Sequence, residues 1–234
     1  MANDWKRIWS NRHLDNRSAD PIELFVELKR CNGFDTLGGA ISANALVEQY
    51  ERIKKRLIEG APNTINSVYE FGCGSGANLL LFERDGFSCG GIDYSESLID
   101  IAKDVLKTGD LICSEAVNAP EEPQYDCVLS NSVIAYFTDF DYARAVFEKM
   151  YKKTRYSIGI IDVFDSEKES AYIDYRRKTV ENFDEKYAGL PKLFYSRDFF
   201  TEFAREHNLR IEFCDSTVEN YWNNDFIFNC FMYK

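Results

Sequence analysis

Three glycines at alternate positions mark a stretch of this chain that could bind a nucleotide-sized ligand. Gly72, Gly74 and Gly76 follow Glu70 and lie between an apolar run and a segment with helical spacing. Glycine accepts a positive φ and lets a ligand approach the backbone closely. Asp93 ends the next apolar run, 21 positions beyond Gly72. A carboxylate there can accept hydrogen bonds from both hydroxyls of a ribose, so the spacing predicts a site for a nucleoside-containing ligand.

Two other classes of nucleotide site match this loop less well. The chain contains no GxxxxGK[ST] sequence, so a triphosphate-binding loop would lack its lysine. A dinucleotide site prefers GxGxxG, and the sixth position counted from Gly72 is Ala77, which is a tolerated variant. The loop alone therefore leaves an NAD-dependent oxidoreductase open as an alternative.

Alternating strand-like and helix-like segments begin at about residue 64 and would position these residues. Strands are expected at 65–71, 88–94, 110–115, 125–131 and 155–164, and helices at 76–86, 95–109 and 139–153. Ser95 is the expected N-cap of the helix over 95–109, and Gly109 is its expected stop. Alternation at this spacing predicts a doubly wound α/β fold with a mostly parallel sheet.

The C-terminal segment departs from this alternation. Two strand-like runs, 208–218 and 224–234, are joined by a short loop that holds Tyr221, Trp222 and Asn223. Parallel strands need a connection of about a dozen residues or more. The sequence therefore predicts an antiparallel C-terminal hairpin, which is not the usual end of a dinucleotide-binding domain.

Composition narrows the set of partners. The chain has 28 Lys and Arg against 39 Asp and Glu, a net charge of −11, which repels a phosphate backbone, so we expect no nucleic-acid partner. No apolar run approaches the ~20 residues of a membrane helix, and residues 1–16 lack the apolar core of a signal peptide. We therefore expect a cytoplasmic protein with no membrane partner. The seven cysteines form no CxxC pair and are expected to be reduced.

The glycine loop and the terminal hairpin together carry a family resemblance. The pattern Glu70-x-Gly72-x-Gly74-x-Gly76 resembles motif I of class I S-adenosylmethionine (SAM)-dependent methyltransferases, and the hairpin resembles that fold's reversed seventh strand. The resemblance covers about residues 64–163 and the last 27 residues. It implies a seven-stranded sheet in the order 3-2-1-4-5-7-6, with SAM as cofactor and S-adenosylhomocysteine (SAH) as product.

The resemblance also implies roles for individual positions. The loop from Gly72 to Gly76 would hold the methionine part of SAM, and Asp93 would bind the ribose. Tyr94 would lie against the adenine, and the Glu115-Ala116 pair, where many members have Asp-Ala, would read the adenine edge. The expected cofactor-binding residues are Glu70, Gly72, Cys73, Gly74, Gly76, Asp93, Tyr94, Glu115, Ala116 and Asn131.

The expected reaction places modest demands on catalytic residues. Methyl transfer from a sulfonium is an in-line displacement, so the enzyme aligns donor and acceptor and accepts a proton where one must leave. The carboxyl edge of the sheet offers Asn131, Ser132, Tyr136, Asp162 and Asp165. From these groups and the two histidines we expect the catalytic set to be Asp162, Tyr136 and His13.

His207, a metal ion and nucleic acid are not expected to take part in the reaction. His207 is expected to be a surface or capping residue. Although Asp162, Asp165 and Asn131 could imitate the metal ligands of catechol-type methyltransferases, we expect no metal. The Asn/Asp-Pro-Pro-Tyr motif of DNA amino methyltransferases is missing after the strand at 125–131. The acceptor is therefore expected to be a small molecule, methylated on oxygen or nitrogen.

Two regions lie outside the resemblance. Residues 1–60 are expected to form an N-terminal helical cap, with a glycine-containing hinge at 32–39 before a helix over 41–58. Residues 61–234 would form the methyltransferase domain, with an acceptor-side insertion at 165–200. The insertion resembles, more loosely, small-molecule methyltransferases of cell-surface carbohydrate and natural-product pathways. A SAM-binding scaffold without activity stays open as an alternative.

The insertion contains the residues expected to bind the acceptor. If 172–178 is helical, Tyr172 and Arg176 share a face, whereas Arg177 points elsewhere. Arginine matches a carboxylate or phosphate with a bidentate fork, so Arg176, or less readily Arg177, is expected to bind an anionic group of the acceptor. Tyr187 would line the same pocket. The alternative is a solvated helix face that pairs with nearby acidic residues.

Overall fold

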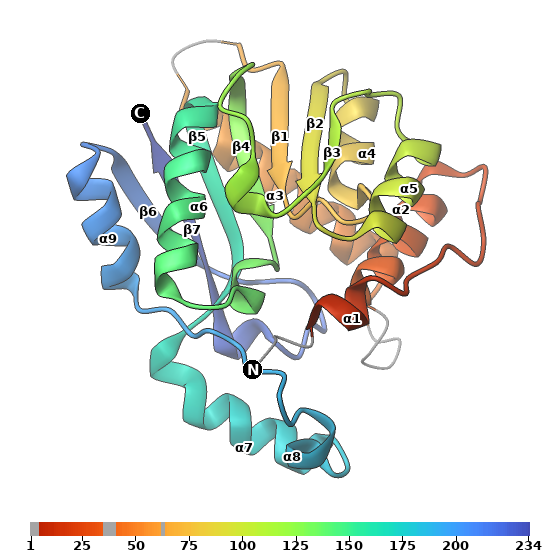
Figure 1. The fold of residues 1–234 in the computed structure, drawn as a ribbon, viewed down its shortest axis with the longest axis vertical. Helices are drawn as coiled ribbons and strands as arrows, with labels where there is room; N and C mark the ends of the chain where they lie inside the picture. The colour runs from red at the N-terminus through yellow and green to blue at the C-terminus, as the bar shows by residue number, and fades with distance from the viewer. Residues whose placement is uncertain (1–4, 35–40, 62–63) are drawn as a thin grey trace.

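The computed structural model describes residues 5–34, 41–61 and 64–234, and its centre is one seven-stranded sheet (Figure 1). The strand order is β3-β2-β1-β4-β5-β7-β6. Strands β1 to β5 pair in parallel, and β7 is antiparallel to both β5 and β6. The strands are β1 Ser67–Phe71, β2 Ser88–Asp93, β3 Leu111–Cys113, β4 Tyr125–Asn131, β5 Thr154–Phe164, β6 Arg210–Asp215 and β7 Ile227–Tyr233. The predicted fold class and strand order are confirmed.

Helices cover both faces of this sheet. The main helices are α1 Trp5–Trp9, α2 Pro21–Lys29, α3 Ala43–Glu59, α4 Ala77–Arg84, α5 Glu96–Val105, α6 Phe140–Lys153, α7 Glu169–Thr179, α8 Phe183–Lys186 and α9 Arg197–Glu206. A π-helical turn, η1 Arg30–Phe34, continues α2. Apolar side chains of α2, α3, α4 and α5 form the core on one face, and those of α6 and α9 form the core on the other.

Strand β1 shows why the sheet has a core on each side. Its five residues are all buried, and successive side chains point to opposite faces, so Val68 and Tyr69 belong to different cores. A strand covered on both faces is nearly continuously apolar, and Glu70 is the one charged residue in this strand. A buried carboxylate requires partners, and those partners lie in the site described below.

Two details differ from the sequence prediction. Helix α5 ends at Val105, before the expected stop at Gly109, because the Glu83 carboxylate accepts hydrogen bonds from the amides of Lys107 (3.0 Å) and Thr108 (2.8 Å). The predicted antiparallel hairpin is confirmed, but the connection between its strands, 216–226, is longer than expected. There Asn224 donates to the Val218 carbonyl at 2.7 Å and accepts from its amide at 3.2 Å.

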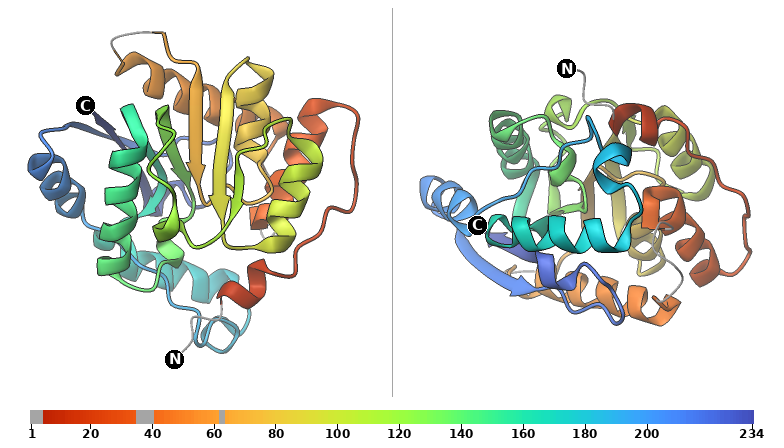
Figure 2. Two further views of the ribbon diagram at one scale, coloured as in Figure 1. Left: turned by 45° about the horizontal axis from the view of Figure 1, so that its top comes forward. Right: turned by 90° about the horizontal axis from the view of Figure 1, so that it is seen from below.

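The N-terminal helices lie in two different places. Helices α2 and α3 share the core of the sheet, and no break in that core falls at residue 60. Helix α1 instead lies at the carboxyl ends of the parallel strands, beside the excursion formed by α7 and α8 (Figures 1 and 2). Of the expected hinge at 32–39, positions 35–39 lie outside the described residues. Among the described helices, none is long and apolar enough to span a membrane.

Candidate functional site

A cavity of about 430 Å³ lies where the carboxyl ends of β1, β2 and β4 meet. In an open α/β sheet this point, where the strand order reverses, is where ligands bind. The sequence-predicted residues that line the cavity are Glu70, Gly72, Gly74, Asp93, Tyr94, Glu115, Ala116, Asn131 and Tyr136. Cys73 and Gly76 do not line it: Cys73 is buried beneath the loop, and Gly76 is the N-cap of α4.

The glycine loop is held in a conformation that only glycine adopts easily. Gly72, Gly74 and Gly76 all have a positive φ, of 72°, 53° and 81°. A Cβ at Gly74 would overlap the side chain of Asn32, which accepts a hydrogen bond from the Ser75 amide at 2.9 Å. The loop is therefore covered on its outer side by the N-terminal segment, a contact that sequence spacing does not reveal.

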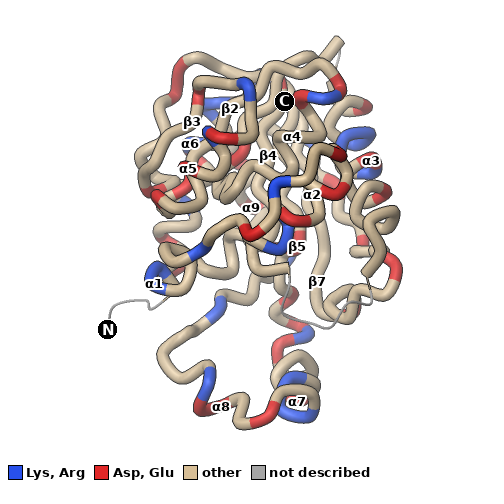
Figure 3. Tube along the Cα trace, turned by 90° about the vertical axis from the view of Figure 1, so that its right-hand side faces the viewer, with Lys and Arg blue, Asp and Glu red and all other residues tan. Residues whose placement is uncertain are grey.

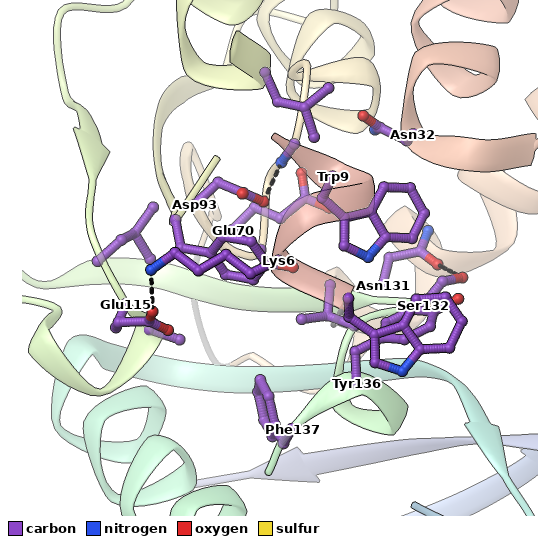
Figure 4. A pocket seen from close by; sticks show the side chains of 18 of the residues that line it. Lys6, Trp9, Asn32, Glu70, Asp93, Glu115, Asn131, Ser132, Tyr136 and Phe137 are labelled. Carbon is purple, nitrogen blue, oxygen red and sulfur yellow. Dashed lines mark hydrogen bonds and ion pairs between the residues drawn. The ribbon is translucent and has the colours of Figure 1, made fainter. Parts of the chain in front are cut away.

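Asp93 ties the end of β2 to this loop. One carboxylate oxygen accepts a hydrogen bond from the Gly74 amide and the other accepts one from the Ser95 amide, each at 2.9 Å. Burial raises the pKa of Asp93, and these two bonds oppose that shift. The carboxylate lines the cavity with lone pairs to spare, so it can orient the loop and still accept hydrogen bonds from a ligand (Figure 4).

Glu70, on β1, belongs to a chain of buried hydrogen-bonded side chains that begins with Lys29 on helix α2. Its Oε1 accepts a hydrogen bond from Asn78 Nδ2 at 2.6 Å, and Asn78 Oδ1 accepts one from Lys29 Nζ at 2.8 Å. Burial raises the pKa of Glu70 and lowers the pKa of Lys29. Glu70 Oε2 is buried with no partner in the described structure, and all three residues line the cavity. A buried carboxylate oxygen without a hydrogen-bond partner can accept a hydrogen bond from a ligand.

Helix α1 forms a wall of the cavity. The Trp9 carbonyl accepts a hydrogen bond from Ser95 Oγ at 2.8 Å, and Lys6 Nζ lies 2.9 Å from Glu115 Oε1. The rings of Trp5 and Trp9 have their centroids 4.7 and 5.6 Å from that of Tyr136. Figure 4 shows Lys6 and Trp9 among the side chains that line the cavity, together with Glu70 and Asp93 from the strand ends.

Asp162 and Ser132 form a strained pair: Asp162 lies within β5 where the register with β7 shifts, and Ser132 directly follows β4. Both residues are in the left-handed region, with φ of 58° and 59°, and such strain is commonly found at functional sites. Ser132 Oγ donates to Asp162 Oδ2 at 2.6 Å, while Asp162 Oδ1 is buried with no partner in the described structure. Burial raises the pKa of Asp162, and the bond from Ser132 opposes the shift. Ser132 lines the cavity and Asp162 stands behind it.

Neither histidine is near this pair. The His13 side chain is 79% exposed, lies 3.1 Å from Asp15 and does not line the cavity, so the structure gives no support to the catalytic role expected for it. His207 caps α9 and lies 2.9 Å from Glu148. Among the described residues no group of three His, Cys, Asp or Glu side chains is placed to hold a metal ion.

The predicted acceptor-binding residues of the insertion fall in two environments. Arg177 is 54% exposed and forms an ion pair with Asp184 at 3.0 Å, so it belongs to the surface. Arg176 and Tyr172 are buried on the other side of α7, and Arg176 Nη2 donates to the Tyr187 hydroxyl at 2.8 Å. None of these four residues lines the 430 Å³ cavity.

Several cavity residues that sequence reasoning missed come from the N-terminal segment: Trp5, Lys6, Trp9, Lys29, Asn32 and Phe34. The others lie in or beside the sheet and its helices: Asn78, Ile92, Leu98, Val133, Phe137, Thr138 and Tyr142. Lys29, for example, is the last residue and the one lysine of α2. Its sequence neighbours give no sign that it is buried against Asn78.

Comparison with known proteins agrees with this geometry. Residues 68–156 match the model of a family described as a methyltransferase domain. No curated protein sequence matches the chain significantly. Solved structures do match the chain. The three described next share less than 25% of their sequence with it, so the similarity shows a common fold.

Three such structures illustrate the likeness. Magnesium protoporphyrin IX methyltransferase from Synechocystis PCC 6803 with bound SAH is 12% identical with a TM-score of 0.60, covering 92% of this chain and 100% of that one. The plantazolicin methyltransferase BpumL, in complex with a pentazolic desmethylPZN analog and SAH, is 12% identical with a TM-score of 0.64, covering 99% of each chain. The N-methyltransferase NodS from Bradyrhizobium japonicum WM9 is 12% identical with a TM-score of 0.56, covering 82% of this chain and 97% of that one.

The fold and the family match together define the class. The chain has the fold of class I SAM-dependent methyltransferases, and the resemblance predicted from the glycine loop is confirmed.

Proposed function

We propose that this protein is a SAM-dependent methyltransferase that acts on an oxygen or nitrogen atom of a small molecule. One observation carries the proposal. In the same cavity, the glycine loop is hydrogen-bonded to Asp93, and Glu70 has a buried carboxylate oxygen with no partner in the described structure. These two carboxylates match the two polar ends of SAM, the ribose and the methionine ammonium.

The residues present fit the cofactor. Glu70 would accept a hydrogen bond from the ammonium, and Lys29 is the cation that would face the methionine carboxylate. Asp93 would accept hydrogen bonds from the ribose, and Tyr94 and Ala116 would line the adenine side. Glu115, which already pairs with Lys6, would link α1 to that side. Bound SAM would supply an electrophilic methyl group.

The chain's own part in catalysis is to align the acceptor and take its proton. Ser132 Oγ lines the cavity and is bonded to Asp162, so a proton that leaves the acceptor can pass to the Asp162 carboxylate through the hydroxyl. The raised pKa of Asp162 makes it a stronger base than an ordinary aspartate. Tyr136 lines the same part of the cavity and would position the acceptor.

Several features favour a small acceptor. Helix α1, through Trp5 and Trp9, closes one side of the cavity, which leaves little access for a macromolecular chain. The net charge of −11 opposes nucleic acid.

Activity is tested by SAM-dependent formation of SAH with a panel of candidate acceptors. Release of SAH that requires both protein and acceptor, and that is lost in Asp93→Ala, supports the proposal. SAM binding with no turnover for any acceptor would favour a SAM-binding scaffold instead.

A further inference from the structure

Two cations lie close together beside the cavity, and neither has an acidic partner among residues 5–34, 41–61 and 64–234. Arg176 is only 6% exposed, its Nη2 donates to the Tyr187 hydroxyl, and its Nε is buried with no partner in the described structure. Lys192, which is half-buried, takes part in no hydrogen bond or ion pair with the described residues. The neighbouring Arg177, by contrast, is exposed and paired with Asp184.

Aromatic rings surround both cations. The Arg176 guanidinium lies 5.1 Å from the ring centroids of both Tyr187 and Trp222. Lys192 Nζ lies 4.3 Å from the centroid of Phe164 and 5.4 Å from that of Tyr172. Ring faces attract cations but carry no net charge, so they offset only part of the cost of removing these groups from water.

The two cations also repel each other. Burial, and after it the charge of Arg176, lowers the pKa of Lys192 to about 7. Two like charges held together are unfavourable unless a counter-ion is present, and since the described part of the chain supplies none, a ligand can fill that role. Their position thus indicates a binding site for an anion.

This site adjoins the cavity proposed for the methyl donor. Tyr136 lines the cavity, and Lys192 Nζ lies 5.4 Å from the centroid of the same ring. Trp5, which also lines the cavity, has its ring centroid 6.5 Å from that of Tyr187. Figure 3 shows α7 and α8 at the same end of the molecule as α1, so a ligand held at the cations would reach toward the end of β4.

We propose that Arg176 and Lys192 form a subsite for the anionic group of the methyl acceptor, and that the acceptor is a small aromatic carboxylate or aryl phosphate. The inference rests on the proposed function and names its substrate class. Arginine and lysine would bind the anion by charge-assisted hydrogen bonds, and the surrounding rings favour a flat apolar body. Tyr136 would lie between the anion and the methyl donor.

Calorimetric titration of benzoate and phenyl phosphate into the protein, with and without saturating SAH, tests this subsite. Benzamide is the uncharged control. We expect at least one of the two anions to bind, and the tighter of them indicates whether the group is a carboxylate or a phosphate. Its affinity should fall at least tenfold in Arg176→Met and in Lys192→Met, and stay unchanged in the matched surface variant Arg177→Met.

Two results would overturn the inference: benzamide binding as tightly as the anions, or equal anion affinity in all three variants. If Arg176→Met does not fold, as judged by circular dichroism, Lys192→Met decides alone. SAH affinity is measured in the same proteins and should not change in these variants. Absence of SAH binding to the unmodified protein would contradict the proposed function, whereas the anion titration without SAH still reports on the subsite.

Discussion

Asp93 is the residue on which the proposed cofactor site depends most, because it both accepts from the Gly74 amide and lines the cavity. Replacing it with alanine should weaken SAH binding by about 1–3 kcal/mol, the scale of losing charge-assisted hydrogen bonds. Isothermal titration calorimetry measures the change. A folded Asp93→Ala protein with unchanged SAH affinity would remove this residue from the site.

Asp162 is the residue proposed to take the proton. Once an acceptor is found, Asp162→Asn should lower kcat by about 10²-fold or more while SAH affinity stays the same, since general bases contribute on this scale. Activity of the unmodified protein should fall as pH drops through the raised pKa of Asp162, because the protonated carboxyl cannot accept a proton. Steady-state kinetics across pH would reveal both effects, and a normal kcat in Asp162→Asn would assign the pair a structural role.

Local spacing explains which site residues could be predicted from sequence. Gly72, Gly74 and Asp93 are brought together by one strand–turn–helix–strand unit, so their separation along the chain already places them. Lys29 and Asn78 meet across 49 residues, and their hydrogen bond depends on how α2 packs against α4. Periodicity shows that α2 has an apolar face, but it does not show that a lysine on that helix is buried.

At the scale of elements, the glycine loop and the N-terminal segment act as one structure. Gly74→Val should abolish measurable SAH binding and leave the sheet intact, because a branched side chain resists the φ of 53° and overlaps Asn32. Gly109→Val is the matched control, since Gly109 has free space around it and no positive φ. Native circular dichroism combined with undiminished SAH affinity in Gly74→Val would contradict the loop assignment.

Elements were predictable where their signals are local. The two short apolar runs of the hairpin, too close for a crossover, required an antiparallel pair. The end of α5 was missed because it is set by Glu83 on the preceding helix, and not by Gly109. The place of α1 beside the strand ends depends on Trp9 reaching Ser95, a contact between residues 86 positions apart that no sequence pattern indicates.

At the scale of the whole molecule, the net charge of −11 conceals a local excess of positive charge. Folding places Arg176 and Lys192 among aromatic rings, with no acidic partner among the described residues. Most other basic side chains of the insertion lie at the surface. The overall composition could not reveal two buried cations placed side by side. Only the packing of α7 against the segment before α9 brings them together.

This arrangement predicts how stability depends on pH. The pKa of Lys192 is lowered to about 7 in the folded protein, so the unfolded chain binds more protons between that value and its ordinary pKa near 10.5. Stability should therefore rise with pH across this window. Removing the group in Lys192→Met should raise Tm relative to the unmodified protein most at pH 6, and the difference should shrink toward pH 10.

Thermal melts at several pH values provide the measurement. Lys178→Met, which changes an exposed lysine of the same insertion, is the matched control and should show no such trend. A Tm difference for Lys192→Met that does not vary with pH would mean that Lys192 keeps an ordinary pKa in the folded protein.

The central claim, that the cavity at the ends of β1, β2 and β4 is a SAM site, is tested most directly by titrating SAM, SAH and NAD separately into the unmodified protein. A ligand that binds only the folded state must also raise its Tm, so melting shifts and calorimetry should agree. We predict binding of SAM and SAH with a 1:1 stoichiometry and no binding of NAD. Binding of NAD without SAM or SAH would contradict the account and restore the oxidoreductase alternative.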